Sequence, residues 1–224
     1  MSPSTRPSIP AASPPATLAA VDLGCRRGNR LLFKGLNFEL HPGQARWLRG
    51  RNGSGKTSLL RLAASLAQPD TGRITWGGVP VRHATGYARQ MSYVGHANGL
   101  KDDLTLTESL RFLARLHECD ASAAAVHAAL DRLGLADRRE APVRTLSQGQ
   151  RRRGALARLA LDGAAAALWI LDEPYDALDA DGVARVDRLL REHVDGGGSL
   201  LLTSHQPPGP GAPGMAETDL GAFA

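Results

Sequence analysis

Apolar and polar residues follow two periods along this chain. Short runs that are almost wholly apolar have the length of buried strands, and longer segments repeat apolar residues every three or four positions, as amphipathic helices do. Apolar strands separated by helices indicate a largely parallel sheet that is covered on both faces. The predicted strands cover 45–50, 72–81 (two short strands around the turn at Gly77 and Gly78), 91–95, 167–174 and 199–205.

The helical pattern is concentrated in the middle of the chain. Thr105 and Glu108 have the spacing of a capping box and mark the start of one helix. No strand pattern interrupts the helical segments between 105 and 162, which predicts a helical lobe at about 97–160 inserted into an α/β core. The predicted helices cover 56–67, 105–116, 121–135, 147–161 and 180–194.

Both ends of the chain differ in composition from its centre. Residues 1–16 are rich in Pro, Ser and Ala, which predicts a disordered tail. The segment from Pro207 to Gly214 is broken by Pro and Gly, which predicts a second, flexible tail over 207–224. We therefore expect one folded domain over 17–206.

Composition narrows the class of protein only slightly. A chain of 224 residues with 42% hydrophobic residues suits a single domain, and its net charge of +5 fits a nucleotide enzyme, a membrane-surface protein or a nucleic-acid binder equally well. Cys25 and Cys119 have no metal-site spacing, and we expect both to be reduced in a cytosolic protein. The longest apolar run is too short to span a bilayer and no secretory signal is visible, so we expect membrane contact through a partner only.

The segment GRNGSGKT predicts a phosphate site. It matches the Walker A pattern and lies between a predicted strand and a predicted helix, which is the context that this motif requires. Loop amides at the start of a helix bind phosphates, Lys56 adds a positive charge at the β- and γ-phosphates, and the hydroxyl of Thr57 can bind Mg²⁺. The predicted nucleotide-binding residues of this loop are Gly50, Arg51, Asn52, Gly53, Ser54, Gly55, Lys56, Thr57 and Ser58.

The segment LWILDEP predicts the second half of that site. Its four apolar residues form a buried strand, and two carboxylates follow at the carboxyl end, where open α/β sheets bind ligands. We expect Asp172 to hold Mg²⁺ through water, and Glu173 to position or deprotonate the attacking water.

The segment LSQGQ resembles the signature motif of ABC-type ATPases and precedes the LWILDEP strand, as it does in that family. The resemblance covers about residues 17–206 and implies a P-loop ATPase fold with an antiparallel N-terminal β part. It also implies a head-to-tail homodimer in which the signature of one copy contacts the ATP of the other. The implied signature residues are Leu146, Ser147, Gln148, Gly149 and Gln150, with Gln148 in place of the usual second glycine.

Further motifs of the same family occur in the expected order. Asp176, Ala177, Leu178 and Asp179 resemble the D-loop, which runs along the dimer interface. His205 matches the switch histidine that contacts the γ-phosphate.

Two positions depart from the family pattern. His96 stands where the Q-loop usually has glutamine, at the usual distance from Glu108. No aromatic residue stands where the family stacks one on adenine; Arg27, or its neighbour Arg26, lies at about that place, and a guanidinium can stack on a base.

Several segments together resemble one group within this family, the ATP-binding subunits (CcmA type) of the haem exporter of cytochrome c maturation. They are VGH, GLKDDLT, PVRTLSQGQRRR, LWILDEP and TSHQP. The resemblance implies an ATPase with ATP and Mg²⁺ as cofactors, bound peripherally to the cytoplasmic face of the bacterial inner membrane. It implies as partners a CcmB-like permease, docked near 96–118, and other maturation proteins. The species that is moved stays open, either haem itself or a haem-loaded chaperone that is released.

Two other functions use an ATPase core of the same family. The ATPase subunit of another small exporter, for lipid, lipoprotein or drug, would share the core but should have glutamine at position 96 and an aromatic residue near position 27. An ABC ATPase acting on ribosomes or DNA normally has two ATPase domains or a long coiled coil, and this chain has neither pattern. The basic trio Arg151–Arg153 is interpreted as a solvated helix face, so no nucleic-acid partner is expected.

Overall fold

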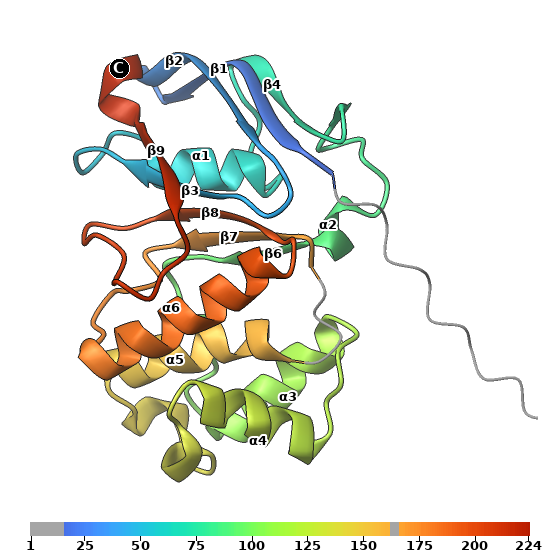
Figure 1. The fold of residues 1–224 in the computed structure, drawn as a ribbon, viewed down its shortest axis with the longest axis vertical. Helices are drawn as coiled ribbons and strands as arrows, with labels where there is room; N and C mark the ends of the chain where they lie inside the picture. Colours follow the sequence, from blue (N-terminus) through green and yellow to red (C-terminus); the bar gives the residue numbers. More distant parts are fainter. Residues whose placement is uncertain (1–15, 162–165) are drawn as a thin grey trace, which may run out of the picture.

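Two β-sheets and a helical lobe are stacked along the long axis of the molecule. The computed structural model describes residues 16–161 and 166–224. In Figure 1 the N-terminal sheet lies at the top, α1 lies between the two sheets, and the helices of the lobe lie at the bottom. Most of the predicted N-terminal tail, 1–15, lies outside the described residues.

The elements follow the expected alternation of strand and helix. The strands are β1 (Leu18–Arg27), β2 (Arg30–Leu40), β3 (Ala45–Arg49), β4 (Thr71–Trp76), β5 (Val79–Pro80), β6 (Met91–Val94), β7 (Leu168–Asp172), β8 (Ser199–Thr203) and β9 (Met215–Asp219). The α-helices are α1 (Lys56–Ala63), α2 (Tyr87–Gln90), α3 (Leu106–Leu116), α4 (Ala123–Arg132), α5 (Gln148–Ala157) and α6 (Ala180–Asp195). Short 3₁₀ helices are η1 (Ala136–Arg138), η2 (Val143–Thr145), η3 (Arg158–Ala160) and η4 (Leu220–Phe223).

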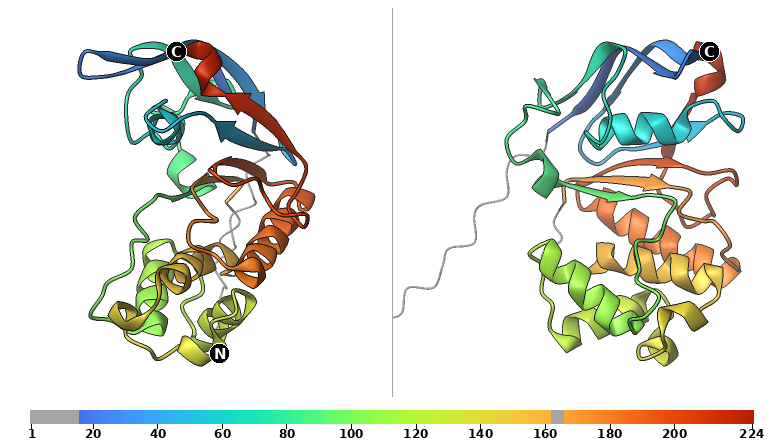
Figure 2. Two further views of the ribbon diagram at one scale, coloured as in Figure 1. Left: turned by 90° about the vertical axis from the view of Figure 1, so that its left-hand side faces the viewer. Right: turned by 180° about the vertical axis from the view of Figure 1, so that it is seen from behind.

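The larger sheet is parallel throughout, in the order β6-β7-β8-β3-β9. Every residue of β7 and β8 is buried, because α1 covers one face of the sheet while α5 and α6 cover the other (Figure 2). The smaller sheet has the antiparallel order β2-β1-β4-β5. The predicted fold class, with its antiparallel N-terminal part and inserted helical lobe, is confirmed.

Capping explains why the helices of the lobe begin where they do. Thr105 caps α3 and forms the predicted capping box with Glu108, and Ser147 forms a second capping box with Gln150 at the start of α5. Ser122 accepts a hydrogen bond from the first turn of α4. Helices α1, α4 and α5 are shorter than predicted. Helix α1 ends at Ala63 rather than at residue 67, because Ser65 takes a left-handed conformation with φ of 58°.

The prediction of a flexible tail over 207–224 is wrong. Residues Met215–Asp219 form β9, which pairs with β3 in parallel register from Ala45–Met215 to Arg49–Asp219. The side chain of Leu220 is 0% exposed and lies in the core beneath the N-terminal sheet. An edge strand with only one covered face needs few apolar residues, and the segment MAETD has no apolar run. The hydrophobic pattern therefore did not predict this strand.

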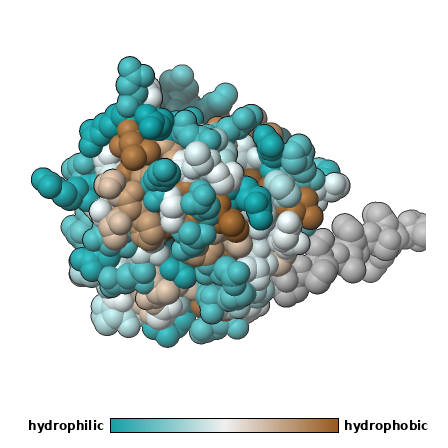
Figure 3. All heavy atoms as spheres, turned by 90° about the horizontal axis from the view of Figure 1, so that it is seen from above, coloured by the Kyte–Doolittle hydropathy of each residue, from teal (hydrophilic) through white to brown (hydrophobic). Residues whose placement is uncertain are grey.

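The outer face of the N-terminal sheet is largely hydrophilic. Seen from above, its apolar residues stand in small groups among hydrophilic ones (Figure 3). The large apolar side chains exposed on the strands of this sheet are Val21, Leu31 and Val79. Among the residues that the structure describes, no helix combines the length and the apolar character needed to cross a bilayer.

A stacked aromatic pair joins α6 to the parallel sheet. The ring of His193 lies on the indole of Trp169, with ring centroids 3.8 Å apart and an interplanar angle of 3°. A Cβ atom at Gly198 would lie 2.1 Å from the His193 ring, so only glycine fits there. Burial lowers the pKa of His193 to about 4, and its hydrogen bond with the carbonyl of Ser199 opposes this effect only in part.

Replacing Leu220 with alanine tests the role of the C-terminal segment. We expect Leu220→Ala to lower the free energy of unfolding by about 2–5 kcal/mol, because it removes a fully buried side chain. Urea denaturation measures this change. The control Leu116→Ala, at a leucine that is 65% exposed, should change it by less than about 0.5 kcal/mol. Equal, small effects of both variants would mean that the C-terminal segment does not contribute to the fold.

The His193 ring should make the stability of the fold depend on pH. The folded chain favours neutral His193, so this contribution is complete above pH 6.5 and is lost as the pH falls towards 4. The loss from this group should be on the order of 3 kcal/mol, measured by urea denaturation across that range. In His193→Phe, which keeps a ring but cannot titrate, the slope with pH should shrink. The control His83→Gln, at an exposed histidine, should keep the wild-type slope.

Candidate functional site

The phosphate loop joins β3 to a helix start that has no side-chain cap. Gly55 precedes α1 with φ of 100°, and no side chain accepts a hydrogen bond from the first amides of the helix. A Cβ atom at Gly55 would also lie 3.0 Å from the ring of Phe33, so the position requires glycine on two grounds. Helices α3, α4, α5 and α6 are all capped by side chains, whereas the first amides of α1 are left free, and free amides at a helix start can bind an anion.

Lys56 is a buried cation at this helix start. The residue is only 8% exposed. Its Nζ atom donates hydrogen bonds to the carbonyl oxygens of Gly50 at 2.8 Å and Arg51 at 3.4 Å. Among the described residues no carboxylate lies within ion-pair distance of Nζ. A buried charge held only by carbonyl oxygens is well suited to an anionic phosphate.

Asp172 and Thr203 end the neighbouring strands β7 and β8. They are paired in register, and the Thr203 hydroxyl donates to Asp172 Oδ1 at 2.8 Å. The other carboxylate oxygen, Oδ2, is buried without a hydrogen-bond partner. An orphaned buried oxygen of this kind fits a hydrated Mg²⁺ ion, and Thr57 lines the same pocket. Within the described ranges no three His, Cys, Asp or Glu side chains form a metal cluster, so water and phosphate oxygens would complete the coordination.

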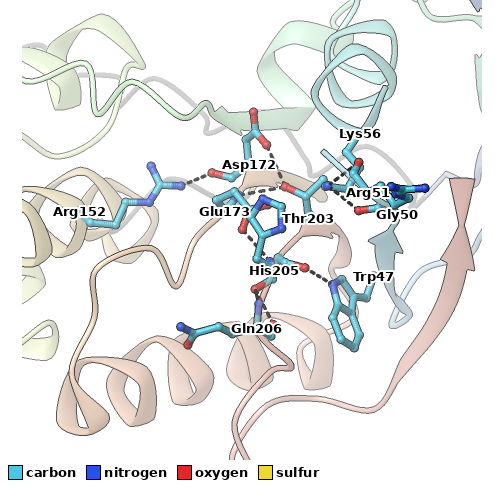
Figure 4. A network of polar contacts seen from close by, with 11 residues as sticks. Trp47, Gly50, Arg51, Lys56, Arg152, Asp172, Glu173, Thr203, His205 and Gln206 are labelled. Atoms are coloured by element: carbon cyan, nitrogen blue, oxygen red, sulfur yellow. Dashed lines mark hydrogen bonds and ion pairs between the residues drawn. The ribbon is translucent and has the colours of Figure 1, made fainter. Parts of the chain in front are cut away.

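Glu173 and His205 form a second pair at the same sheet edge (Figure 4). The Glu173 carboxylate accepts a hydrogen bond from the backbone N–H of His205 at 2.9 Å, and the His205 Nε2 atom lies 3.5 Å from its other oxygen. The backbone of Glu173 has a left-handed φ of 55°, and its N–H donates to the Thr203 hydroxyl at 3.0 Å. A bent backbone held at both ends aims this carboxylate at the pocket.

One pocket of about 450 Å³ brings most of the predicted residues together. Of the two arginines considered for adenine stacking, Arg27 lines the pocket and Arg26 does not. His96 lines it as well. The predicted site residues on its wall are Arg27, Asn52, Gly53, Gly55, Lys56, Thr57, Ser58, His96, Asp172, Glu173, Asp176, Ala177 and His205.

The other predicted residues lie around this pocket. Gly50 and Arg51 line a second pocket, whose wall also includes Glu217 and Asp219 of β9, and Ser54 packs against Gly50. Leu178 comes directly after Ala177, which lines the pocket, but does not line it itself. Asp179 caps α6 by accepting a hydrogen bond from the amide of Gly182 at 2.8 Å.

The signature start packs against the D-loop of the same chain. Gln148 Nε2 donates to Asp176 at 3.1 Å, and a Cβ atom at Gly149 would lie 2.4 Å from the carbonyl oxygen of Ala177. Ser147 and Gln148 are exposed, and the five signature residues, Leu146–Gln150, are not on the wall of the pocket.

The interpretation of Arg151–Arg153 as a solvated helix face is wrong. Arg152 is 3% exposed, and its Nη1 donates to the carbonyl oxygen of Gly95 at 2.9 Å. Arg153 donates to the carbonyl oxygens of Leu133 and Gly134. A signal was available in the sequence, because helical periodicity places Arg152 on the same face as the apolar residues Ala155, Leu156 and Leu159.

Thr203 and Tyr175 are site residues that the sequence patterns did not reveal. Thr203 follows a buried apolar run at the carboxyl end of β8, so the rule that identified Asp172 applies to it equally. Tyr175 lines the pocket and donates a hydrogen bond to the buried carboxylate of Asp187 at 2.8 Å. No pattern in the sequence connects those two residues.

Comparison with known proteins agrees with this geometry. The model of the ABC transporter family matches residues 33–176. Two cytochrome c biogenesis ATP-binding export proteins CcmA are similar: that of Nitrosospira multiformis is 47% identical over 85% of this chain and 92% of its own length, and that of Pseudomonas putida is 48% identical over 92% and 98%.

The solved structures give the same result for the fold. A putative ABC transporter ATP-binding protein from Pyrococcus furiosus superposes with a TM-score of 0.80 at 22% identity, covering 93% of this chain and 99% of that one. At that identity the likeness concerns the fold alone. The sequence matches extend over most of both chains and therefore carry the assignment: this chain belongs to the ABC transporter family, and within it to the CcmA group of cytochrome c biogenesis ATP-binding export proteins.

Proposed function

We propose that this chain is the ATP-hydrolysing subunit of an ABC exporter that moves haem, or releases a haem-loaded chaperone, in the biogenesis of c-type cytochromes. The observation that carries the proposal is the single pocket lined by Lys56, Asp172, Glu173 and His205, in a chain that is 47–48% identical to CcmA proteins over most of its length. His96 and Arg27, the two positions that set this chain apart from the common ABC pattern, line that pocket too.

In the proposed reaction, the amides of α1 and Lys56 bind the triphosphate of ATP, and Arg27 stacks on the base. Thr57 and Asp172 would hold Mg²⁺, which would screen the negative charge of the phosphates. Glu173 accepts a proton from the attacking water, and His205, which already contacts the Glu173 carboxylate, reads the γ-phosphate. His96 lies on the same wall and senses the γ-phosphate through its loop.

We further propose that two copies sandwich two ATP molecules. The start of α5 lies at exposed residues outside the chain's own pocket, where a phosphate of a second copy can reach it and would compete with the Ser147–Gln150 capping box for the first amides of the helix. Its contact with Asp176 and Ala177 of the same chain would bring this chain's own D-loop to the same interface.

The membrane partner is proposed to be a CcmB-like permease, at the cytoplasmic face of the bacterial inner membrane, together with other maturation proteins. Its proposed docking region is 96–118. There Phe112 and Leu116 stand one helical turn apart on α3, 49% and 65% exposed, and Lys101 Nζ lies 5.3 Å from the centroid of the Phe112 ring. An exposed apolar pair of this kind fits a partner helix better than it fits water.

Replacing Lys56 tests the assignment to cytochrome c biogenesis. Cells that carry Lys56→Ala should lose haem staining of all c-type cytochromes while b-type haem remains, because the variant lacks the charge that holds the phosphates. The matched control is Lys34→Ala, at an exposed lysine on β2, which should keep normal staining. Normal haem staining of c-type cytochromes in cells with Lys56→Ala would contradict the assignment to cytochrome c biogenesis and favour the ATPase subunit of another small exporter.

Replacing Glu173 tests its role as the base. Glu173→Gln should bind ATP, trap the closed dimer and lower the ATP turnover number by at least about 100-fold, because the amide cannot accept the proton. Hydrolysis by the purified membrane complex and size-exclusion chromatography with ATP measure the two effects. Glu192→Gln, on the surface of α6, is the control and should behave as the wild type. Full turnover by Glu173→Gln would remove Glu173 from this role.

A further inference from the structure

Arg152 is a buried cation to which the proposed reaction assigns no step. It lies on α5, the helix that starts at the signature, and faces the layer between that helix and the parallel sheet. Burying a guanidinium is costly unless its N–H groups find acceptors. Burial lowers the pKa of Arg152, while the nearby carboxylates of Asp172, Asp176 and Glu173 act in the opposite direction. A buried guanidinium at such a position is therefore expected to make specific hydrogen bonds that hold neighbouring segments in place.

Three acceptors from two different segments meet at this one guanidinium. Nη1 donates to the carbonyl oxygen of Gly95 at 2.9 Å and to the side-chain oxygen of Asn98 at 3.2 Å. Nη2 donates to the backbone carbonyl oxygen of Asp172, the contact drawn in Figure 4. Gly95 and Asn98 flank His96, and Asp172 ends β7. A single side chain therefore joins the loop of His96 to the strand end that carries both site carboxylates.

Neighbouring arginines bind the same loop along its length. Arg158 donates to the carbonyl oxygen of Tyr93, where β6 ends, and Arg151 pairs with Asp102 at 3.1 Å. Burial and the charge of Arg152 lower the pKa of Arg158 to about 10, which shows how closely the two cations are enclosed. At Gly154 a Cβ atom would lie 2.8 Å from Leu106 Cδ1, so the helix and the start of α3 also touch directly. The signature helix and the segment 93–106 thus form one connected unit.

We infer that Arg152 is a positioning residue that transmits movement of the signature helix to the backbone of Asp172 and to the loop of His96. The inference rests on the proposed function, because the signature contacts the partner's ATP only in the dimer. Ser147 and Arg152 lie within two turns of one helix, so a shift of the signature onto that phosphate moves the guanidinium with it. ATP bound at one site then sets the geometry of the carboxylates at the other.

The test is steady-state ATP hydrolysis by the purified complex with its membrane partner. In Arg152→Gln we expect kcat to fall at least about tenfold while the KM for ATP changes less than about threefold. We expect the Hill coefficient for ATP to exceed 1 in the wild type and to fall to about 1 in Arg152→Gln, which a merely structural residue would not cause. Arg152→Lys keeps the charge but cannot reach all three acceptors, so its kcat and Hill coefficient should lie between those of the wild type and of Arg152→Gln. Arg188→Gln, at an exposed arginine on α6, is the control.

Hydrogen exchange separates positioning from loss of the fold. In the Glu173→Gln background, ATP should slow amide exchange in 146–150 and in 95–98 when Arg152 is intact, and only in 146–150 when Arg152→Gln is added. An unchanged kcat and Hill coefficient, or coupled protection that survives the substitution, would overturn the inference. If Arg152→Gln does not fold, Arg152→Lys carries the same measurements. A complex with intact Arg152 that neither hydrolyses ATP nor closes would overturn the proposed function, and this inference with it.

Discussion

Asp172 and Thr203 end two neighbouring parallel strands in the same register, and the hydrogen bond between their side chains measures 2.8 Å. Because carboxyl ends of parallel strands meet at one sheet edge, this pairing also determines where Glu173 and His205 stand. The Thr203 hydroxyl occupies one oxygen of Asp172 and leaves the other free and buried. A slip of one residue between β7 and β8 would separate this free oxygen of Asp172 from the side chains of Glu173 and His205.

The sequence predicted those parts of the site that depend on local residues. A few neighbouring residues are enough to indicate a glycine loop before a helix, or carboxylates after a buried strand. The sequence therefore predicted the places of Lys56 and Asp172 directly. The parts that depend on distant contacts were missed or misread. Tyr175 donates a hydrogen bond to Asp187 on α6, a contact that no local pattern indicates. Arg152 was interpreted as solvated because it is charged, although its position in the helix places it on the apolar face. The edge strand β9 has no apolar run, so only pairing with β3 reveals it.

Buried polar groups give this molecule its connections, while its apolar layers give it its shape. The core is built mainly from Leu, Ala and Val, which pack without regard to direction. Hydrogen bonds from Arg152, Arg158 and Thr203 have fixed partners, and each one joins two elements that lie far apart in sequence. In the proposed coupling, movement between nucleotide states would follow these hydrogen bonds, since directional contacts resist rearrangement more selectively than apolar ones.

The strand that carries the phosphate loop has both of its neighbours near the end of the chain. β3 ends at Arg49, whereas β8 begins at Ser199 and β9 at Met215. A ribosome releases the chain from its N-terminus, so β3 leaves the exit tunnel long before either partner is synthesised. The sheet beneath the phosphate loop can therefore be completed only after β8 and β9 have left the tunnel, so this part of the fold depends on contacts between residues far apart in the sequence.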